Sequence, residues 1–188
     1  PDPSAHRIVG LYMMTVNGQL MFIADATINI YPDARTLAEI ALQTARVARR
    51  FGVTPKVAML SFSNFGTSNE LRTDRIEEAI TMAREMDRGL VIDGPMQADT
   101  ALVPDRQKEF PFMEFEGPAN VLVCPNLASA NIAYKLLQRI AGAEMTGPIL
   151  EGLAKPAHVL QRGDSVRQVV HMAAITAVDA QRHAKQRL

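Results

Sequence analysis

The chain has 188 residues, of which 47% are hydrophobic and 21% are charged, as expected for a globular protein with a sizeable core in one or two domains. Its 20 basic and 20 acidic residues cancel, which argues against a general nucleic-acid binder because such proteins usually carry a basic face. No apolar run approaches the ~18 residues of a membrane-spanning helix, so we expect no membrane contact. The single cysteine, Cys124, favours a reducing, cytoplasmic setting. The four scattered histidines show no metal-ligand spacing, so we expect no metal.

The first quarter of the chain predicts a β-hairpin followed by a helix. Asn17-Gly18 lies between two apolar runs, and this dipeptide favours the tight turn of a hairpin because both residues tolerate positive φ. Apolar residues then recur at helical spacing over residues 32–52. Thr36 and Glu39 have the spacing of a capping box at the start of this helix.

Strands and helices alternate through the rest of the chain. The last helix, 164–181, is apolar on nearly every side in its middle, so we expect it to be buried. The charged segment 105–118 contains two prolines and reads as an exposed loop. This order predicts an α/β fold, a three-layer mixed or parallel sheet with flanking helices. The other expected strands are 56–63, 90–94, 120–126 and a short one with a turn at 147–156. The other expected helices are 70–87, a short helix or turn near 96–104, and 126–140. Asn126 can cap the last of these, and each of the two longer helices has apolar residues at helical spacing on one side: Ile76, Ala79, Ile80 and Ala83 in the first, and Leu127, Ala130, Ala133, Leu136, Leu137 and Ile140 in the second.

Ligands of such sheets bind outside the carboxyl ends of the strands. This rule selects the loops 61–68, 93–99 and 124–131, and the turn 159–165 joins them as a helix start. In the second of these loops, Asp93 and Asp99 could bind a metal or share a proton, but no further ligands lie nearby, which favours a capping or solvated role.

The loop SFSNFGTS, residues 61–68, is rich in groups that could bind an anion. Its hydroxyl and amide groups can donate hydrogen bonds, and Gly66 lets backbone N–H groups approach a phosphate. The alternative is an ordinary connector in which Thr67 or Ser68 caps the next helix, and composition alone favours that alternative. The polar side chains concerned are those of Ser61, Ser63, Asn64, Thr67 and Ser68.

Two basic stretches are further candidates. Asn131, Lys135 and Arg139 share one face of a helix, which is either a binding surface or a solvated side. Lys155 and Arg162 lie near the start of the last helix, where a guanidinium and the helix dipole could hold a phosphate. The competing interpretation, with equal weight, is that Asp164 simply caps that helix. None of these stretches builds a Ser-His-Asp or Cys-His arrangement.

Taken together, SFSNFGT, DGPMQADTAL, the run from Ala119 to Gly163 and AAITAVDAQ resemble the phosphate acetyltransferase (phosphotransacetylase) family over about residues 8–182. The resemblance implies a two-subdomain α/β fold similar to isocitrate dehydrogenase, dimers, and acetyl transfer between coenzyme A and phosphate. A family domain is longer than this chain, so we expect residues 1–188 to be its C-terminal portion. Residues 8–150 would form mainly the second subdomain, and 151–188 a returning C-terminal helix region.

The resemblance also identifies which residues of the family motifs are replaced in this chain. Active members carry Ser-Arg-Gly before the last helix and an Asp several residues later, which serves as base towards the thiol. This chain keeps Arg162 and Gly163 but has Gln161 and Gln168 at the other two positions, and Pro95 replaces the Glu of a DGE motif. Because glutamine cannot accept a proton at neutral pH, we expect no catalytic residue here.

The pattern is most similar to the C-terminal phosphotransacetylase-like domain of large bacterial malic enzymes. That resemblance implies a parent that converts malate to pyruvate with NADP and Mg²⁺ or Mn²⁺ in a separate N-terminal part, while this segment carries no cofactor. It further implies a homo-oligomer in which this segment binds acetyl-coenzyme A as an allosteric inhibitor. The alternatives are an active acetyltransferase that uses Asp164 or Ser165, and a scaffold that only dimerises the parent.

We expect acetyl-coenzyme A to bind where Arg162, the 61–68 loop and a turn at 145–146 converge. The residues expected to contact it are Ser61, Ser63, Asn64, Thr67, Asn131, Lys135, Thr146, Lys155, Arg162, Gly163 and Ile175.

Overall fold

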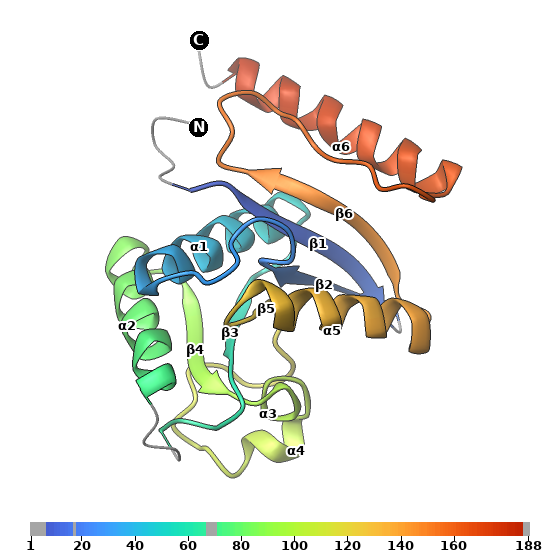
Figure 1. Cartoon of the computed structure of the whole chain (residues 1–188). Helices are drawn as coiled ribbons and strands as arrows, with labels where there is room; N and C mark the ends of the chain where they lie inside the picture. Colours follow the sequence, from blue (N-terminus) through green and yellow to red (C-terminus); the bar gives the residue numbers. More distant parts are fainter. Residues whose placement is uncertain (1–6, 17, 67–70, 186–188) are drawn as a thin grey trace.

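The computed structural model describes residues 7–16, 18–66 and 71–185, which fold around one six-stranded sheet (Figure 1). The strand order is β4-β3-β5-β2-β1-β6. The strands are β1 (Val9–Val16), β2 (Gln19–Ala24), β3 (Lys56–Leu60), β4 (Val91–Met96), β5 (Val121–Val123) and β6 (Glu144–Glu151). The helices are α1 (Ala34–Arg50), α2 (Leu71–Met86), α3 (Ala98–Leu102), α4 (Pro104–Gln107), α5 (Leu127–Ile140) and α6 (Val166–Lys185).

The sheet is mixed, as predicted. β4, β3, β5 and β2 run parallel to one another, and β1 is antiparallel to both β2 and β6. The predicted hairpin is confirmed, because Val16 pairs with Gln19 and Gly18 has φ of 77°. β6 therefore closes one edge of the sheet beside the hairpin, and β4 closes the other edge.

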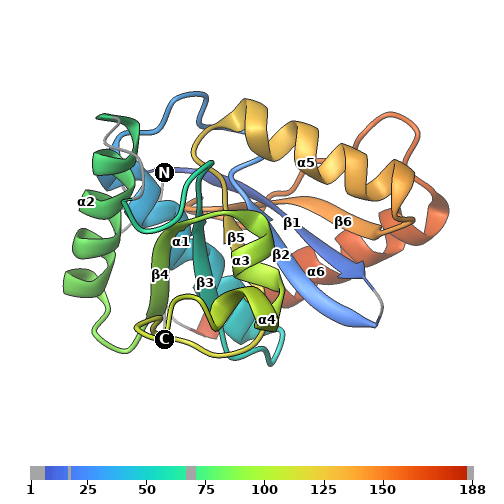
Figure 2. The same ribbon diagram turned by 90° about the horizontal axis from the view of Figure 1, so that it is seen from below.

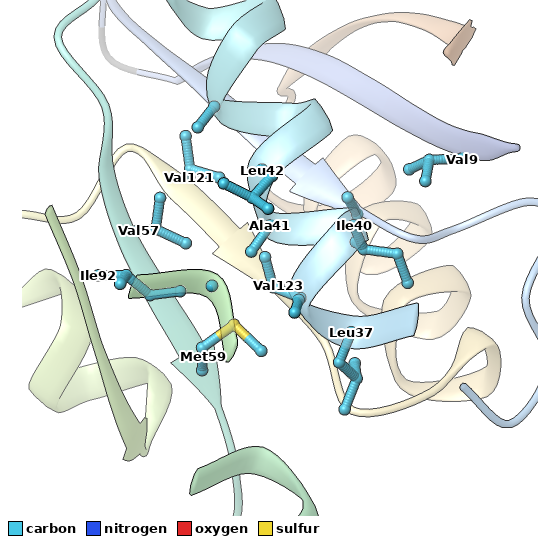
Figure 3. Packing of buried hydrophobic residues seen from close by; sticks show 14 of the residues in the cluster. Val9, Leu37, Ile40, Ala41, Leu42, Val57, Met59, Ile92, Val121 and Val123 are labelled. Atoms are coloured by element: carbon cyan, nitrogen blue, oxygen red, sulfur yellow. The ribbon is translucent and has the colours of Figure 1, made fainter. Parts of the chain in front are cut away.

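Helices cover both faces of the sheet, which confirms the three-layer prediction. Alternate residues of a strand point to opposite faces, so Phe22 joins the apolar cluster beneath α1 and α2 while Ile23 joins the cluster beneath α5. Figure 2 shows α1 and α5 on opposite sides of the strands. In Figure 3 the α1 side chains Leu37, Ile40 and Ala41 lie among the strand side chains Val57, Met59, Val121 and Val123.

The predicted capping box of α1 is wrong. Asp33 is the N-cap, and its carboxylate accepts a hydrogen bond from the Thr36 backbone N–H at 2.8 Å. Hydrogen bonds from Thr36 lower the pKa of Asp33. Glu39 faces Arg35 at 3.4 Å and makes no bond to the cap. The Asp33 carboxylate, directly before the first turn, accepts from a free backbone N–H of that turn, so the helix begins at Ala34 and Thr36 lies inside it.

The segment 105–118 is more ordered than an exposed loop. Gln107 is buried, and its amide group donates to the Gly117 carbonyl at 3.0 Å and accepts from the Gly117 N–H at 2.9 Å. Phe115 is also buried in the cluster beneath α5. The Gln107 side chain thus supplies hydrogen-bond partners for backbone groups that would bond to water in an exposed loop.

The prediction that α6 is buried is also wrong. Met172 and Asp179 are its buried residues among those described, whereas Val166 is 81% exposed and Val170 59% exposed. The reason is position: α6 lies along β6 at the outer edge of the sheet, where the described part of the chain provides no second layer over it (Figure 1). None of the described helices has both the length and the apolar character needed to cross a membrane.

The predicted apolar side of α5 is confirmed in part, because Ala130 is buried and Ala133 and Leu137 pack against the same cluster. Ala130 and Tyr134 face the sheet, whereas Leu136 and Ile140 are 52% and 80% exposed. The prediction is therefore wrong for Leu136 and Ile140 alone. The predicted N-cap is confirmed, because Asn126 accepts from the Ser129 N–H at 2.9 Å.

Candidate functional site at the start of the last helix

The turn that carries Arg162 is closed by its own residues. The Asp164 carboxylate accepts from the Gln161 N–H at 2.7 Å, and the Asp164 N–H donates to the Gln161 carbonyl at 3.2 Å. Gly163 has φ of 90°, a conformation that favours glycine. Arg162 is exposed at the tip of the turn. Asp164 therefore closes the turn and does not cap α6, so the capping alternative is wrong.

Ser165 and Gln168 cap α6 instead. The Gln168 N–H donates to the Ser165 hydroxyl at 3.3 Å, and the Gln168 side-chain oxygen accepts from the Ser165 N–H at 2.8 Å. The Gln168 amide nitrogen donates to the Met145 carbonyl of β6 at 3.2 Å. This is a capping box, and it occupies both ends of the Gln168 amide with structural hydrogen bonds.

Gln161 is also occupied by a structural contact. Its side-chain nitrogen donates to the hydroxyl of Tyr12 on β1. Tyr12 is buried and stacks on Tyr134 of α5, with ring centroids 4.2 Å apart. Both glutamines of the turn and helix start thus hold this region onto the sheet.

A cavity of about 280 Å³ lies between the start of α6, the start of β6 and the end of α5. The expected turn at 145–146 is wrong, because these residues belong to β6, but the buried Thr146 does line this cavity. The imidazole of His171, one helical turn after Gln168, lines it as well. The carboxylate of Glu144 is engaged with Arg167 at 3.1 Å. Among the described residues that line this cavity, His171 is the basic side chain that is not held in an ion pair.

The 61–66 loop forms a separate polar region. The Asn64 side-chain oxygen accepts from the Gln97 N–H at 2.8 Å, and the Gln97 side chain donates to the Phe62 carbonyl at 2.7 Å. Ser63 is buried, and its hydroxyl has no hydrogen-bond partner among the described residues. Three strands separate β3 from β6, a distance of four inter-strand spacings or roughly 19 Å. Among the described residues no hydrogen bond joins the loop to the Arg162 turn, and their convergence on one ligand stays a prediction.

The aspartate pair near β4 has structural partners. Asp93 accepts from the N–H groups of Gly94 and Glu114, both at 2.9 Å, and lies 3.6 Å from Arg84. Asp99 accepts from the Thr100 N–H at 2.9 Å. Among the described residues, no group of three or more histidine, cysteine, aspartate or glutamate side chains is arranged to hold a metal.

The lone cysteine is not an activated nucleophile. Cys124 follows β5 and is buried. Burial raises the pKa of its thiol to about 12, so the thiol stays protonated at neutral pH.

A buried polar network fixes α6 to the rest of the chain. The His158 Nδ1 atom accepts from the Leu150 N–H at 3.0 Å, and Nε2 lies 3.2 Å from Asp179 of α6. Because a backbone N–H can only donate, Nδ1 accepts and Nε2 carries the proton that is donated to Asp179. Arg50 of α1 pairs with Asp179 at 3.3 Å and also with Glu151. The network therefore links α1, β6, the segment after it and α6.

The two carboxylates of this network respond oppositely to pH. Burial raises the pKa of Glu151 above its ordinary value of 4.5, and the nearby Arg50 charge only partly offsets this. Burial alone would raise the pKa of Asp179, but its bond from His158 and the Arg50 charge outweigh burial and lower it. Glu151 thus contributes stability that is full below about pH 4.5 and is lost as the pH rises through its raised pKa. The Asp179 contribution is present above its ordinary value of 3.8 and is lost as the pH falls through its lowered pKa.

Replacing Glu151 with Gln is expected to remove the first of these pH dependences. Glutamine resembles the protonated glutamate, so wild type and variant should have similar melting temperatures near about pH 4. As the pH rises, the melting temperature of wild type should drop below that of the variant. Thermal unfolding followed at several pH values from about 4 to 7.5 measures the difference. Parallel melting curves over this range would mean that burial does not raise the pKa of Glu151.

Comparison with known proteins assigns the family. The sequence profile described as phosphate acetyl/butaryl transferase matches residues 2–177. The chain belongs to the phosphate acetyl/butaryl transferase family. It is 41% identical over 172 residues to a phosphate acetyltransferase of Bacillus subtilis, covering 91% of this chain and 53% of the relative. It is 46% identical over 163 residues to an NADP-dependent malic enzyme of Escherichia coli, covering 85% of this chain and 21% of that protein.

Solved structures of the family share the fold. A phosphotransacetylase from Streptococcus pyogenes superimposes with a TM-score of 0.91 at 39% identity, covering 96% of this chain and 56% of the other. The EutD phosphotransacetylase from Staphylococcus aureus gives a TM-score of 0.89 at 38% identity, with coverage of 95% and 56%. The chain thus spans about half the length of the transferase relatives and about a fifth of the malic enzyme.

In this member of the family, the expected ligand-contacting residues fall into separate places. Arg162 and Gly163 form the turn, and Thr146 lines the cavity at the start of α6. Ile175 instead lines another cavity, of about 210 Å³, with Phe51 and Val178. Thr67 lies outside the described residues. Ser61, Ser63 and Asn64 lie in the loop after β3, Asn131 and Lys135 lie on α5, and Lys155 is exposed before His158.

Sequence reasoning missed several residues of this family member. His171 could have been found from its spacing, since it follows Gln168 by three positions on one helix. Tyr12 carries no such signal, because it is one apolar residue among many in a strand. The pairing of His158 with Asp179 joins residues 21 positions apart and depends on how α6 returns along β6.

Proposed function

We propose that this chain contributes to a binding site for acetyl-coenzyme A, and that the turn 161–164 and the start of α6 bind this ligand without transferring its acetyl group. The observation that carries the proposal is that the side chains of Gln161 and Gln168 are both held in structural hydrogen bonds. Gln161 bonds to Tyr12, and Gln168 bonds to Ser165 and to the Met145 carbonyl. Neither amide can accept a proton from a thiol, and both are committed to holding the backbone.

The exposed Arg162 supplies the charge that such a ligand needs. A guanidinium can hold phosphate oxygens with two parallel hydrogen bonds, and it stands at the tip of a turn whose conformation is fixed by Asp164. The start of α6 follows directly, so the positive end of the helix dipole lies close to the same place. The arrangement suits an anionic ligand whether or not chemistry follows.

A regulatory role follows if the chain is the C-terminal part of an NADP-dependent malic enzyme, as the 46% identity to such enzymes supports. Acetyl-coenzyme A would then bind this segment of a homo-oligomer and shift the conformation of the malate-converting part of the same chain. Such a shift requires that the ligand bind two states of the protein with different affinity.

Titration calorimetry of the full-length protein with acetyl-coenzyme A tests the binding itself. The expected result is saturable heat together with a melting temperature that rises with ligand concentration, because a ligand that binds only the folded state stabilises it. Acetyl phosphate alone, which lacks the nucleotide and the thioester, serves as the comparison ligand. Neither heat nor thermal stabilisation with acetyl-coenzyme A would favour a scaffold that binds nothing.

Acetyl transfer between coenzyme A and phosphate is the second candidate. Several of the curated relatives are named phosphate acetyltransferase, and the chain covers 53–56% of them against 21% of the malic enzymes, so the comparisons give this candidate the broader support. His171, in the cavity at the start of α6, is the side chain that favours it. The imidazole would accept the thiol proton, the thiolate sulfur would bond to the carbonyl carbon of acetyl phosphate, and the bond from that carbon to the phosphate oxygen would break to release phosphate.

His171→Ala tests whether His171 or another side chain accepts the thiol proton in this candidate reaction. If His171 is the base, acetyl-coenzyme A formation from acetyl phosphate and coenzyme A should fall by roughly a hundredfold or more in this variant. His183→Ala, on the same helix but away from the cavity, should keep wild-type turnover. Turnover that survives His171→Ala but is lost in Asp164→Ala would move the base to the turn.

A further inference from the structure

Among the described residues, one side chain joins the turn that carries Arg162 to the sheet by a hydrogen bond. The other hydrogen bonds of the turn, between Gln161 and Asp164, stay within the turn and fix its shape but not its place. The Gln161 side chain extends away from the turn and donates to the Tyr12 hydroxyl on β1, 149 positions earlier in the chain. This contact therefore locates the turn relative to the strands.

Tyr12 is a rigid partner for this contact. It is 3% exposed, and its ring stacks on Tyr134 at an interplanar angle of 19°. On the neighbouring strand β6, a Cβ at Gly147 would lie 2.8 Å from the Tyr12 ring, so the ring fits against the backbone only because that residue is glycine. The hydroxyl thus has little freedom to follow a moving turn.

The hydroxyl also keeps its proton. Burial raises the pKa of Tyr12 above its usual range, and Tyr134 and the charge of Asp164 act in the same direction. Across the physiological pH range Tyr12 is therefore a neutral hydroxyl that accepts one hydrogen bond and can donate another.

The length of the glutamine side chain is what makes the contact. Its amide nitrogen lies three bonds beyond Cβ, whereas a serine hydroxyl at the same position would lie only one bond beyond it. We propose that Tyr12 and Gln161 act as a pair that positions the Arg162 guanidinium for its ligand. The Gln161 amide thus makes a contact with Tyr12 that a serine hydroxyl at the same position would be too short to make. The inference rests on the proposed role of Arg162 in binding acetyl-coenzyme A, and it assigns positioning, not catalysis, to both residues.

A double-mutant cycle on the full-length protein tests the pair. Tyr12→Phe and Gln161→Leu should each weaken acetyl-coenzyme A binding by roughly three- to tenfold, as expected for one lost hydrogen bond. The double variant should be no weaker than the worse single variant, because both changes remove the same contact. Tyr31→Phe, at a tyrosine that is 79% exposed, is the matched control and should leave affinity unchanged.

Amide hydrogen exchange of residues 161–165 provides a second measurement that needs no ligand. Exchange there should be faster in both single variants and no faster in the double variant. Additive losses of affinity, unchanged affinity, or unchanged exchange would each overturn the inference. If the wild-type protein binds no acetyl-coenzyme A, the proposed function fails, and the exchange measurement still decides whether Tyr12 and Gln161 hold the turn.

Discussion

Arg50→Ala is expected to lower the free energy of unfolding by about 3 kcal/mol, the lower end of the range for breaking a buried ion pair. Arg50 lies between the carboxylates of Glu151 and Asp179, whose side chains are only 18% and 10% exposed. Without the guanidinium, two buried carboxylates would face each other with only the neutral His158 to bond one of them. The Arg50 side chain is itself 25% exposed, which is why the lower end of the range applies.

Arg49→Ala is the matched control, because Arg49 is the neighbouring residue on α1. It pairs with Asp87 at 3.1 Å, and the two side chains are 41% and 31% exposed. A surface pair of this kind stabilises by roughly 1 kcal/mol or less. Denaturant unfolding of both variants measures the difference, and hydrogen exchange along α6 should increase in Arg50→Ala alone. Equal losses of stability would show that the network does not fix α6.

Arg162→Ala should weaken acetyl-coenzyme A binding by about 1.5–3 kcal/mol, which is roughly tenfold to more than a hundredfold in Kd. The guanidinium is exposed at the tip of a turn that closes through Gln161 and Asp164, so its removal leaves the fold of the turn intact. The loss would therefore come from the missing charged hydrogen bonds. Titration calorimetry gives the affinity, and the melting temperature without ligand should not change.

Arg88→Ala provides the control for charge alone. Arg88 is exposed in the turn after α2, on the opposite edge of the sheet from α6. Its removal changes the net charge by the same amount and should leave affinity unchanged. Equal affinity in wild type and Arg162→Ala would remove Arg162 from the site.

Local signals predicted much of the fold. Asn-Gly marked the hairpin, helical spacing marked α1 and α2, and Asn126 marked the start of α5. The strand order was beyond such signals, because β5 inserts between β2 and β3 although the chain forms it after β4. That insertion depends on contacts between residues far apart in sequence, such as Phe22 with Val121 and Val57 with Val121.

The exposure of α6 had a different cause. An apolar helix predicts burial, but it does not say what covers it, and in the described part of the chain Val166 and Val170 face outward. The same limit applies to the site. The sequence singled out Arg162, Gly163 and the two glutamines, yet the partners of those glutamines come from β1 and β6, which only the folded sheet brings beside the turn.

Acetyl-coenzyme A formation by the full-length protein, measured beside its affinity for acetyl-coenzyme A in the same preparation, tests the central claim most directly. A site that binds without transferring predicts saturable binding of acetyl-coenzyme A and no product above the uncatalysed rate when acetyl phosphate and coenzyme A are supplied. Multiple turnovers per protein chain, abolished by loss of the His171 imidazole or the Asp164 carboxylate, would contradict it.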